Sequence, residues 1–233
     1  MPETRNQYII ARQLSRLYQR GNSSVTALSE ASFSVAQGQV VGLVGPSGAG
    51  KSTLLNILGG LDRPDSGTVQ VGGTELTGLS SEQLASFRRH RVGFVFQEAH
   101  LVPAYTVYEN VMLPLVPMDL PLGEKTRLVQ AALEAANIEH RADHLPGELS
   151  GGEQQRAAVA RAVVNDPELI LADEPTGELD AENAARVMDL LLSLDQGRAR
   201  TIIIASHDAA ALARAERILH IDNGVLGETE DVT

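Results

Sequence analysis

Residues 40–61 read VVGLVGPSGAGKSTLLNILGGL, and the order of residue types predicts a strand, a loop and a helix in succession. The first five residues are apolar or glycine, which is typical of a strand buried on both faces of a parallel sheet. Three glycines within the next six residues favour a tight loop. The segment STLLNILGGL then repeats apolar residues at helical spacing. We therefore expect an α/β fold in which this loop joins a buried strand to a helix.

The loop GPSGAGKS matches the phosphate-binding pattern G-x-x-x-x-G-K-[ST] at every fixed position. Such a loop points backbone N–H groups at phosphate oxygens, and the helix N-terminus adds partial positive charge. We expect Lys51 to reach the β- and γ-phosphates and Ser52 to bind Mg²⁺. A glycine turn that binds nothing is the alternative, but the strand before it and the helix after it favour the phosphate loop. The expected nucleotide contacts in this segment are Gly45, Pro46, Ser47, Gly48, Ala49, Gly50, Lys51, Ser52 and Thr53.

The composition excludes several other classes of protein. With 30 acidic and 19 basic residues the net charge is −11, which disfavours binding to a nucleic-acid backbone. The chain has no cysteine, so disulfides and cysteine-bound metals are excluded. The only lysines are Lys51 and Lys125, and the presence of one of them inside a glycine-rich loop suggests a chemical role.

No segment has the length and apolarity expected of a membrane span. The richest apolar segment, 111–118, contains Pro114 and Pro117 and is far shorter than the roughly 20 residues that a bilayer requires. The N-terminal MPETRNQYII lacks the apolar core of a signal peptide. We expect a soluble chain that contacts a membrane only through a partner.

Strand and helix patterns alternate along most of the chain, which predicts a mostly parallel sheet covered on both faces. Strands are predicted at 8–18, 25–35, 40–44, 67–73, 91–96, 169–172, 201–205, 217–221 and 225–227. Helices are predicted at 152–164, 181–194 and 208–214, and Asn223-Gly224 predicts a hairpin turn. We expect one domain, 1–233, with an α/β core at about 1–78 and 148–233 and a helical insertion at about 79–147.

The segment ELILADEPTGELD, residues 168–180, places two acids directly after an apolar run. The carboxyl end of a buried strand is where an α/β sheet presents ligand-handling groups. We expect Asp173 to hold Mg²⁺, directly or through water, and Glu174 to polarise the attacking water. Two solvated acids would be the better interpretation only if the phosphate loop were absent.

Two single residues are also expected at carboxyl ends of strands. Gln97 follows the strand at 91–96, and His207 follows the strand at 201–205. Of the six histidines, we favour only His207 as functional, because an isolated histidine is more often a packing or surface residue.

The segment LSGGEQQR, residues 149–156, predicts the start of a helix. Ser150 and Glu153 have the spacing of a capping box. Gly151 and Gly152 in the first turn are unexplained by helix formation, because each costs roughly 0.5–1 kcal/mol relative to alanine. Helix formation alone therefore does not account for them.

The phosphate loop, Gln97, LSGGE, LADEPTGELD and IASHD occur in this order, and together they resemble the nucleotide-binding subunit of ATP-binding cassette (ABC) transporters. The resemblance covers about residues 7–226. It implies a phosphate-loop NTPase core with a mostly parallel sheet, an N-terminal antiparallel β subdomain and an inserted α-helical subdomain. It also implies an Mg²⁺-dependent ATPase that works as a head-to-tail homodimer on the cytoplasmic face of the membrane, driving a separate permease.

The same resemblance assigns roles to individual residues. Tyr18 would stack on adenine, although a tyrosine packed on the sheet is the alternative. Gln97 would contact Mg²⁺ or the attacking water, and His207 would contact the γ-phosphate. Asp180 would lie at the dimer interface. The signature residues, which would act on the nucleotide of the partner copy, are Leu149, Ser150, Gly151, Gly152 and Glu153.

The segments ENVMLP, ADEPTGELD and LLNILGGLDRPDSG resemble more closely the subgroup that serves lipoprotein release, macrolide and peptide export, and cell division. Glu178 departs from that subgroup, which more often has asparagine there, and adds an acid near the expected interface. A cell-division or envelope-complex ATPase without true transport stays open as an alternative. A DNA-repair or translation cassette would need a coiled coil or a second cassette, and a small-molecule kinase would leave LSGGE unexplained.

Overall fold

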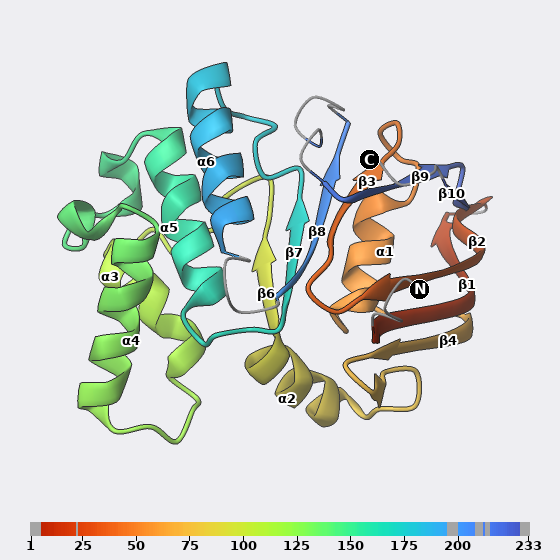
Figure 1. The fold of residues 1–233 in the computed structure, drawn as a ribbon, viewed down its shortest axis with the longest axis horizontal. Coiled ribbons are helices and arrows are strands. Elements are labelled where there is room, and N and C mark those ends of the chain that lie inside the picture. Colours follow the sequence, from red (N-terminus) through yellow and green to blue (C-terminus); the bar gives the residue numbers. More distant parts are fainter. Residues whose placement is uncertain (1–5, 22, 195–199, 208–211, 213–214, 229–233) are drawn as a thin grey trace, which may run out of the picture.

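The computed structural model describes residues 6–21, 23–194, 200–207, 212 and 215–228. Within these residues the chain forms a six-stranded sheet, a four-stranded sheet and the helices that cover them (Figure 1). The strands are β1 (Gln7–Arg20), β2 (Ser23–Ala36), β3 (Val40–Val44), β4 (Ser66–Val71), β5 (Thr74–Glu75), β6 (Val92–Val95), β7 (Leu169–Asp173), β8 (Thr201–Ser206), β9 (Arg217–Asp222) and β10 (Val225–Glu228). The helices are α1 (Lys51–Leu58), α2 (Ser81–Arg91), α3 (Val107–Met112), α4 (Leu122–Ala135), α5 (Gly151–Val163) and α6 (Ala181–Ser193), with short 3₁₀ turns η1 (Leu113–Leu115), η2 (Glu139–Arg141) and η3 (Pro146–Glu148).

The six-stranded sheet has the order β10-β9-β3-β8-β7-β6. All neighbouring pairs from β9 to β6 are parallel, and only β10 pairs antiparallel with β9. The predicted hairpin turn is confirmed, because Asn223 and Gly224 both have positive φ, 47° and 79°. The predicted mostly parallel sheet is therefore correct, and its order sets β8 between β3 and β7.

Both faces of this sheet are buried, as the continuous apolar strands predict. On one face Ile202 and Ile204 of β8 pack with α3, α4, α5 and α6. On the other face Ile203 and Ala205 pack with α1 and with the four-stranded sheet. The four-stranded sheet is antiparallel, in the order β2-β1-β4-β5, and α1 lies between the two sheets in Figure 1.

Two predicted segments differ from the structure. The range 79–147 is not helical throughout, because Val92–Val95 forms β6 and pairs with β7 in the main sheet. Arg91, predicted as the first residue of that strand, ends α2 instead. Most of the helix predicted at 208–214 lies outside the described residues. Among the helices that the structure describes, none is long and apolar enough to cross a membrane.

Candidate nucleotide site

Four neighbouring strands bring the predicted site residues to one edge of the main sheet. The phosphate loop follows β3, His207 follows β8, Asp173 ends β7, and Gln97 comes two residues after β6. These strands are parallel and adjacent, so their carboxyl ends meet at the same edge. Because β8 lies between β3 and β7, His207 stands between the phosphate loop and the acidic segment.

Two glycines of the loop are required by close backbone contacts. A Cβ at Gly45 would lie 2.1 Å from the carbonyl oxygen of Ile221, and one at Gly50 would lie 2.2 Å from that of Ala27. Gly50 also has a φ of 111°, which side chains other than glycine rarely adopt. The loop is therefore wedged between β9 and β2, and any larger residue at these positions must displace backbone.

Lys51 is the first residue of α1 and is almost fully buried, with 6% of its surface exposed. Its Nζ donates hydrogen bonds to the carbonyl oxygens of Gly45 and Pro46, at 2.7 and 3.2 Å. It also lies 3.2 Å from Oε1 of Glu174. The loop thus encloses the ammonium group of Lys51, and the nearby carboxylate of Glu174 balances its positive charge.

Glu174 adopts a backbone conformation that few non-glycine residues tolerate, with a φ of 48°. Hydrogen bonds hold it there: its N–H donates to Ala205 of β8 at 2.9 Å, and its carbonyl accepts from Gly177 at 3.0 Å. Such strain, which costs about 1–3 kcal/mol, persists where the surroundings over-determine it, often at functional sites. Here the turn sends the carboxylate toward the phosphate loop.

The Glu174 carboxylate contacts two other predicted site residues at once. Oε1 faces Lys51, and Oε2 lies 2.5 Å from Nδ1 of His207. The tautomer that carries its proton on Nδ1 would donate a hydrogen bond to the carboxylate at this distance. The carboxylate is 15% exposed and the histidine 65% exposed, so the pair opens toward solvent on the histidine side. The structure therefore brings Lys51, Glu174 and His207 into one cluster.

Asp173 and Ser52 offer oxygen donors beside this cluster. The Ser52 side chain lies close enough to Asp173 to lower the pKa of its carboxyl. Oδ1 of Asp173 is buried and has no hydrogen-bond partner among the described residues. Burial raises the pKa of Asp173, the neighbouring charge of Glu174 raises it further, and Ser52 and Lys51 act against both. An orphaned carboxylate oxygen next to a serine hydroxyl is a donor set that fits Mg²⁺.

Gln97 lies beside the acidic segment. Its Nε2 comes within 3.4 Å of the position that a Cβ on Gly177 would occupy. Gln155, which the sequence did not indicate as a site residue, holds the backbone just before Gln97. Its Nε2 donates a hydrogen bond to the carbonyl of Phe96 at 2.8 Å, and Gln155 is only 3% exposed. The position of Gln155 on the apolar face of α5 could have indicated this role, because a buried amide needs a polar partner.

The predicted capping box at the start of α5 is present. Ser150 Oγ accepts from the N–H of Glu153 at 3.3 Å, and Glu153 accepts from the N–H of Ser150 at 2.8 Å. Arg141 adds a bond from its Nε to Glu153 at 2.8 Å, which the sequence did not reveal. Gly151 and Ser150 are exposed, and Leu149 is buried. The 13-residue helix α5 therefore begins at an exposed residue, Gly151, while the buried Gly152 and the capped N–H of Glu153 face inward.

Gly152 and Asp180 meet through the start of α6. Asp180 caps α6 and accepts two hydrogen bonds from Asn183, at 2.9 and 2.8 Å. A Cβ at Gly152 would lie 2.6 Å from Oδ1 of that asparagine. Within the described residues, the side-chain hydrogen bonds of Ser150 and Asp180 go to Glu153 and Asn183, and none of them reaches Lys51, Glu174 or His207.

Tyr18 lies near the end of β1, opposite Val25 of β2, and is 37% exposed. Two residues further along β2, the carbonyl of Ala27 forms the close contact with Gly50. Successive strand residues are about 3.3 Å apart. Tyr18 therefore belongs to the part of the antiparallel sheet that touches the phosphate loop.

Comparison with known proteins agrees with this geometry. The family model described as ABC transporter matches residues 28–177. The chain is 42% identical over 215 residues to the lipoprotein-releasing system ATP-binding protein LolD of Pseudomonas fluorescens, covering 92% of this chain and 95% of that one. It is 41% identical over 227 residues to the LolD protein of Xanthomonas euvesicatoria pv. vesicatoria, covering 97% and 93%.

Solved structures agree as well. The dimeric, post-hydrolysis structure of the ATP-binding cassette MJ0796 bound to ADP and Pi superposes with a TM-score of 0.89, at 35% identity, and covers 97% of this chain and 99% of that one. The structure of cbiO1 from Clostridium perfringens, part of the ABC transporter complex cbiONQ, has a TM-score of 0.84 at 29% identity, with 95% and 87% covered. With the fold, the phosphate loop and these relatives in agreement, the chain belongs to the ABC transporter family and is an ATPase of the LolD type.

Proposed function

We propose that this protein hydrolyses Mg-ATP as a homodimer and drives a membrane permease that extracts lipoproteins from the outer surface of the membrane. The observation that carries the ATPase chemistry is the cluster of Lys51, Glu174 and His207 at the edge of the main sheet. Both curated relatives bear the lipoprotein-release name over more than nine-tenths of this chain, which favours lipoproteins over macrolides or peptides as cargo. It also favours transport over a purely regulatory division role.

The proposed chemistry is an in-line attack of water on the γ-phosphorus, in which the bond to the β–γ bridging oxygen breaks. Glu174 accepts the proton of the attacking water. His207, in contact with the same carboxylate, orients it and reaches the γ-phosphate. Lys51 exchanges its contact with Glu174 for one with the phosphates, and its Nζ keeps its hydrogen bonds to the carbonyls of Gly45 and Pro46.

Asp173 and Ser52, together with Gln97, are the proposed Mg²⁺ ligands. The ion would neutralise charge on the phosphate oxygens when bound. The support from this chain is the orphaned Oδ1 of Asp173, the Ser52 side chain beside that carboxylate, and the nearness of Gln97 to the acidic segment.

The signature residues, 149–153, act on the nucleotide held by the partner copy. Their exposed helix start offers N–H groups and a serine hydroxyl to an anion. The side-chain hydrogen bonds of Ser150 go to Glu153 in the described chain, and the dimeric form of the similar cassette MJ0796 supports completion of the site by a second copy. Asp180, at the start of α6 beside Gly152, lies at the same interface, and the exposed Glu178 adds charge there.

The protein lies on the cytoplasmic face of the membrane and contacts it only through the permease. The support is the need for cytoplasmic ATP, together with the similarity to ATP-binding proteins of lipoprotein-releasing systems.

The test of this function uses Glu174→Gln beside the unchanged protein. The variant should lose ATP turnover by at least 10²-fold while still binding Mg-ATP and accumulating as a dimer, because only the proton acceptor is removed. Turnover at the parent rate would contradict the role of Glu174. The cargo is tested by reconstituting the protein and its permease in vesicles that carry an acylated lipoprotein or its unacylated form. Release that depends on ATP and on the acyl chains supports the proposal, and equal release of both forms refutes it.

A further inference from the structure

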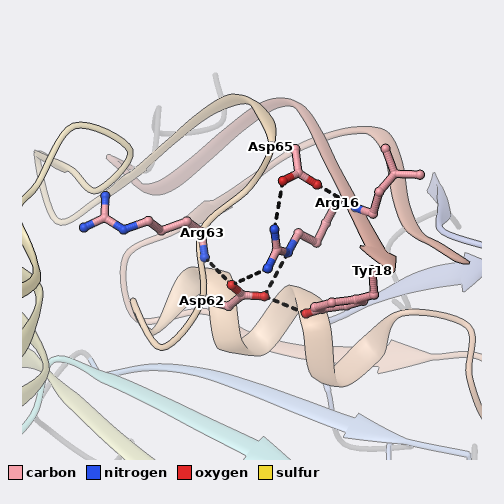
Figure 2. A network of polar contacts seen from close by, with 6 residues as sticks. Arg16, Tyr18, Asp62, Arg63 and Asp65 are labelled. Atoms are coloured by element: carbon pink, nitrogen blue, oxygen red, sulfur yellow. Dashed lines mark hydrogen bonds and ion pairs between the residues drawn. The ribbon is translucent and has the colours of Figure 1, made fainter. Parts of the chain in front are cut away.

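A second polar cluster ties Arg16 and Tyr18 of β1 to the segment between α1 and β4 (Figure 2). Arg16 makes a paired contact with Asp62, from Nε to Oδ2 at 3.0 Å and from one terminal nitrogen to Oδ1 at 2.9 Å. Its other terminal nitrogen binds Asp65 at 2.8 Å. The guanidinium is thus fixed between two carboxylates and has little freedom to rotate.

Tyr18 is held by the same groups on two sides. Its hydroxyl donates to Oδ2 of Asp62 at 2.6 Å. The guanidinium carbon of Arg16 lies 4.7 Å from the centre of its ring, within the range of a cation–π contact. One face of the ring is therefore covered by Arg16, and the edge that carries the hydroxyl is tethered.

The two aspartates of the cluster are stabilised in their charged forms by neighbouring groups. Partial burial alone would raise the pKa of Asp62, but hydrogen bonds from Tyr18 and the N–H of Arg63, with the charge of Arg16, lower it below its ordinary value. The N–H of Leu17 and Arg16 lower the pKa of Asp65 in the same way. The side chain of Arg63 points away from the cluster in Figure 2 and binds the carbonyl of Leu79 instead.

Asp62 connects the cluster to the helix that begins with Lys51. The N–H groups of Leu61 and Asp62 both donate to the carbonyl of Asn56 in α1, at 2.8 and 3.2 Å. The hydroxyl end of the Tyr18 ring is therefore linked to α1 through Asp62. The strand β2, whose Val25 lies opposite Tyr18, contacts the phosphate loop through the carbonyl of Ala27.

We propose that Arg16 and Asp62 are positioning residues for the nucleotide base: they fix the ring of Tyr18 with one face covered and the other free to stack on adenine. This inference rests on the proposed contact of Tyr18 with the base. A ring already fixed loses less conformational freedom when the base binds than a ring that rotates in solvent. The cluster should therefore increase affinity for nucleotides without taking part in the hydrolysis.

The experiment compares Mg-ATP with inorganic tripolyphosphate, which has the phosphates but no base. The variants are Tyr18→Phe, which keeps the ring and removes the tether, Asp62→Asn and Arg16→Gln. Each should raise the KM for ATP about 3- to 10-fold, the range expected for one exposed cation–π or charge-assisted contact, and change kcat less than 2-fold. Inhibition by Mg-tripolyphosphate should stay unchanged. Arg12→Gln, which removes an exposed arginine from the same strand, is the matched control and should leave all three values unchanged.

An unchanged KM in both Tyr18→Phe and Asp62→Asn would overturn the positioning role. An equal weakening of ATP and tripolyphosphate would also overturn it, because the cluster would then act on the phosphate loop. Tyr18→Ala separates this inference from the proposed function. If that variant leaves the KM for ATP unchanged, Tyr18 does not contact the base. If it raises the KM while Arg16→Gln and Asp62→Asn do not, the base contact stands and the positioning role is wrong.

Discussion

Replacing Glu153 by glutamine should destabilise the start of α5 by an amount that depends on pH. The Glu153 carboxylate accepts bonds from the N–H and the hydroxyl of Ser150 and from Arg141, each at 2.8 Å, and is 14% exposed. The N–H and then the hydroxyl of Ser150 do most to lower the pKa of Glu153 from 4.5 to about 2; burial opposes them, and Arg141 lowers the pKa further. The stabilisation is therefore complete above about pH 4.5 and is lost as the pH falls toward about 2.

The magnitude follows from the change of a charged acceptor into a neutral one. Glutamine keeps one acceptor oxygen, so the capping box survives in a weaker form. Hydrogen bonds to charged groups contribute about 1.5–3 kcal/mol and neutral ones about 0.5–1.5, so we expect a loss of about 1–2 kcal/mol in the free energy of unfolding at neutral pH. For a domain of this size that lowers Tm by about 2–8 °C.

The assay is urea unfolding of both proteins from about pH 7 to about pH 3.5, followed by circular dichroism. Glu148→Gln is the control, because Glu148 caps η3 with one bond from the N–H of Leu145 and is exposed. The difference between Glu153→Gln and the parent should exceed that of the control at neutral pH and shrink as the pH falls. If the difference is no larger than the control's, or does not change with pH, the reasoning about Glu153 is refuted.

Asp173→Asn should raise the Tm measured in EDTA without nucleotide, because burial and Glu174 disfavour the charge of Asp173 and raise its pKa; a lower Tm would contradict this. The same variant should lose Mg-dependent ATP hydrolysis, which separates a stabilising change from a functional one. Gly45→Ala should reduce ATP binding and lower Tm, because its Cβ would lie 2.1 Å from the Ile221 carbonyl. A Cβ at Gly78 would meet nothing within 4 Å, so Gly78→Ala is the control, and a loss of Tm at Gly78 as large as that at Gly45 would refute the predicted clash.

Features that depend on residues close together in the sequence could be predicted. The strand-loop-helix unit at 40–61, the acids after β7 and the capping box at Ser150 each follow from local patterns, and the parallel sheet follows from their alternation. The contacts of Arg141 with Glu153, of Gln155 with Phe96 and of Arg16 with Asp62 could not be predicted, because each joins segments whose approach depends on tertiary packing. The strand β6 was expected, but the sequence did not show that it pairs with β7 at the edge of the main sheet. Its apolar pattern gives no information about its partner, so the predicted helical range 79–147 wrongly included it.

The central claim is that two copies share each active site, with Lys51 from one copy and Ser150 from the other. The most direct test mixes Lys51→Ala with Ser150→Arg, each of which should be inactive alone and should leave the fold intact by circular dichroism. In a head-to-tail mixed dimer one site contains both changes and the other contains neither. Equal mixing should therefore restore roughly a quarter of the parent ATP turnover, since half of the dimers are mixed and each has one intact site. If the mixture stays inactive although mixed dimers form, or if Ser150→Arg alone turns over ATP normally, the shared site is contradicted.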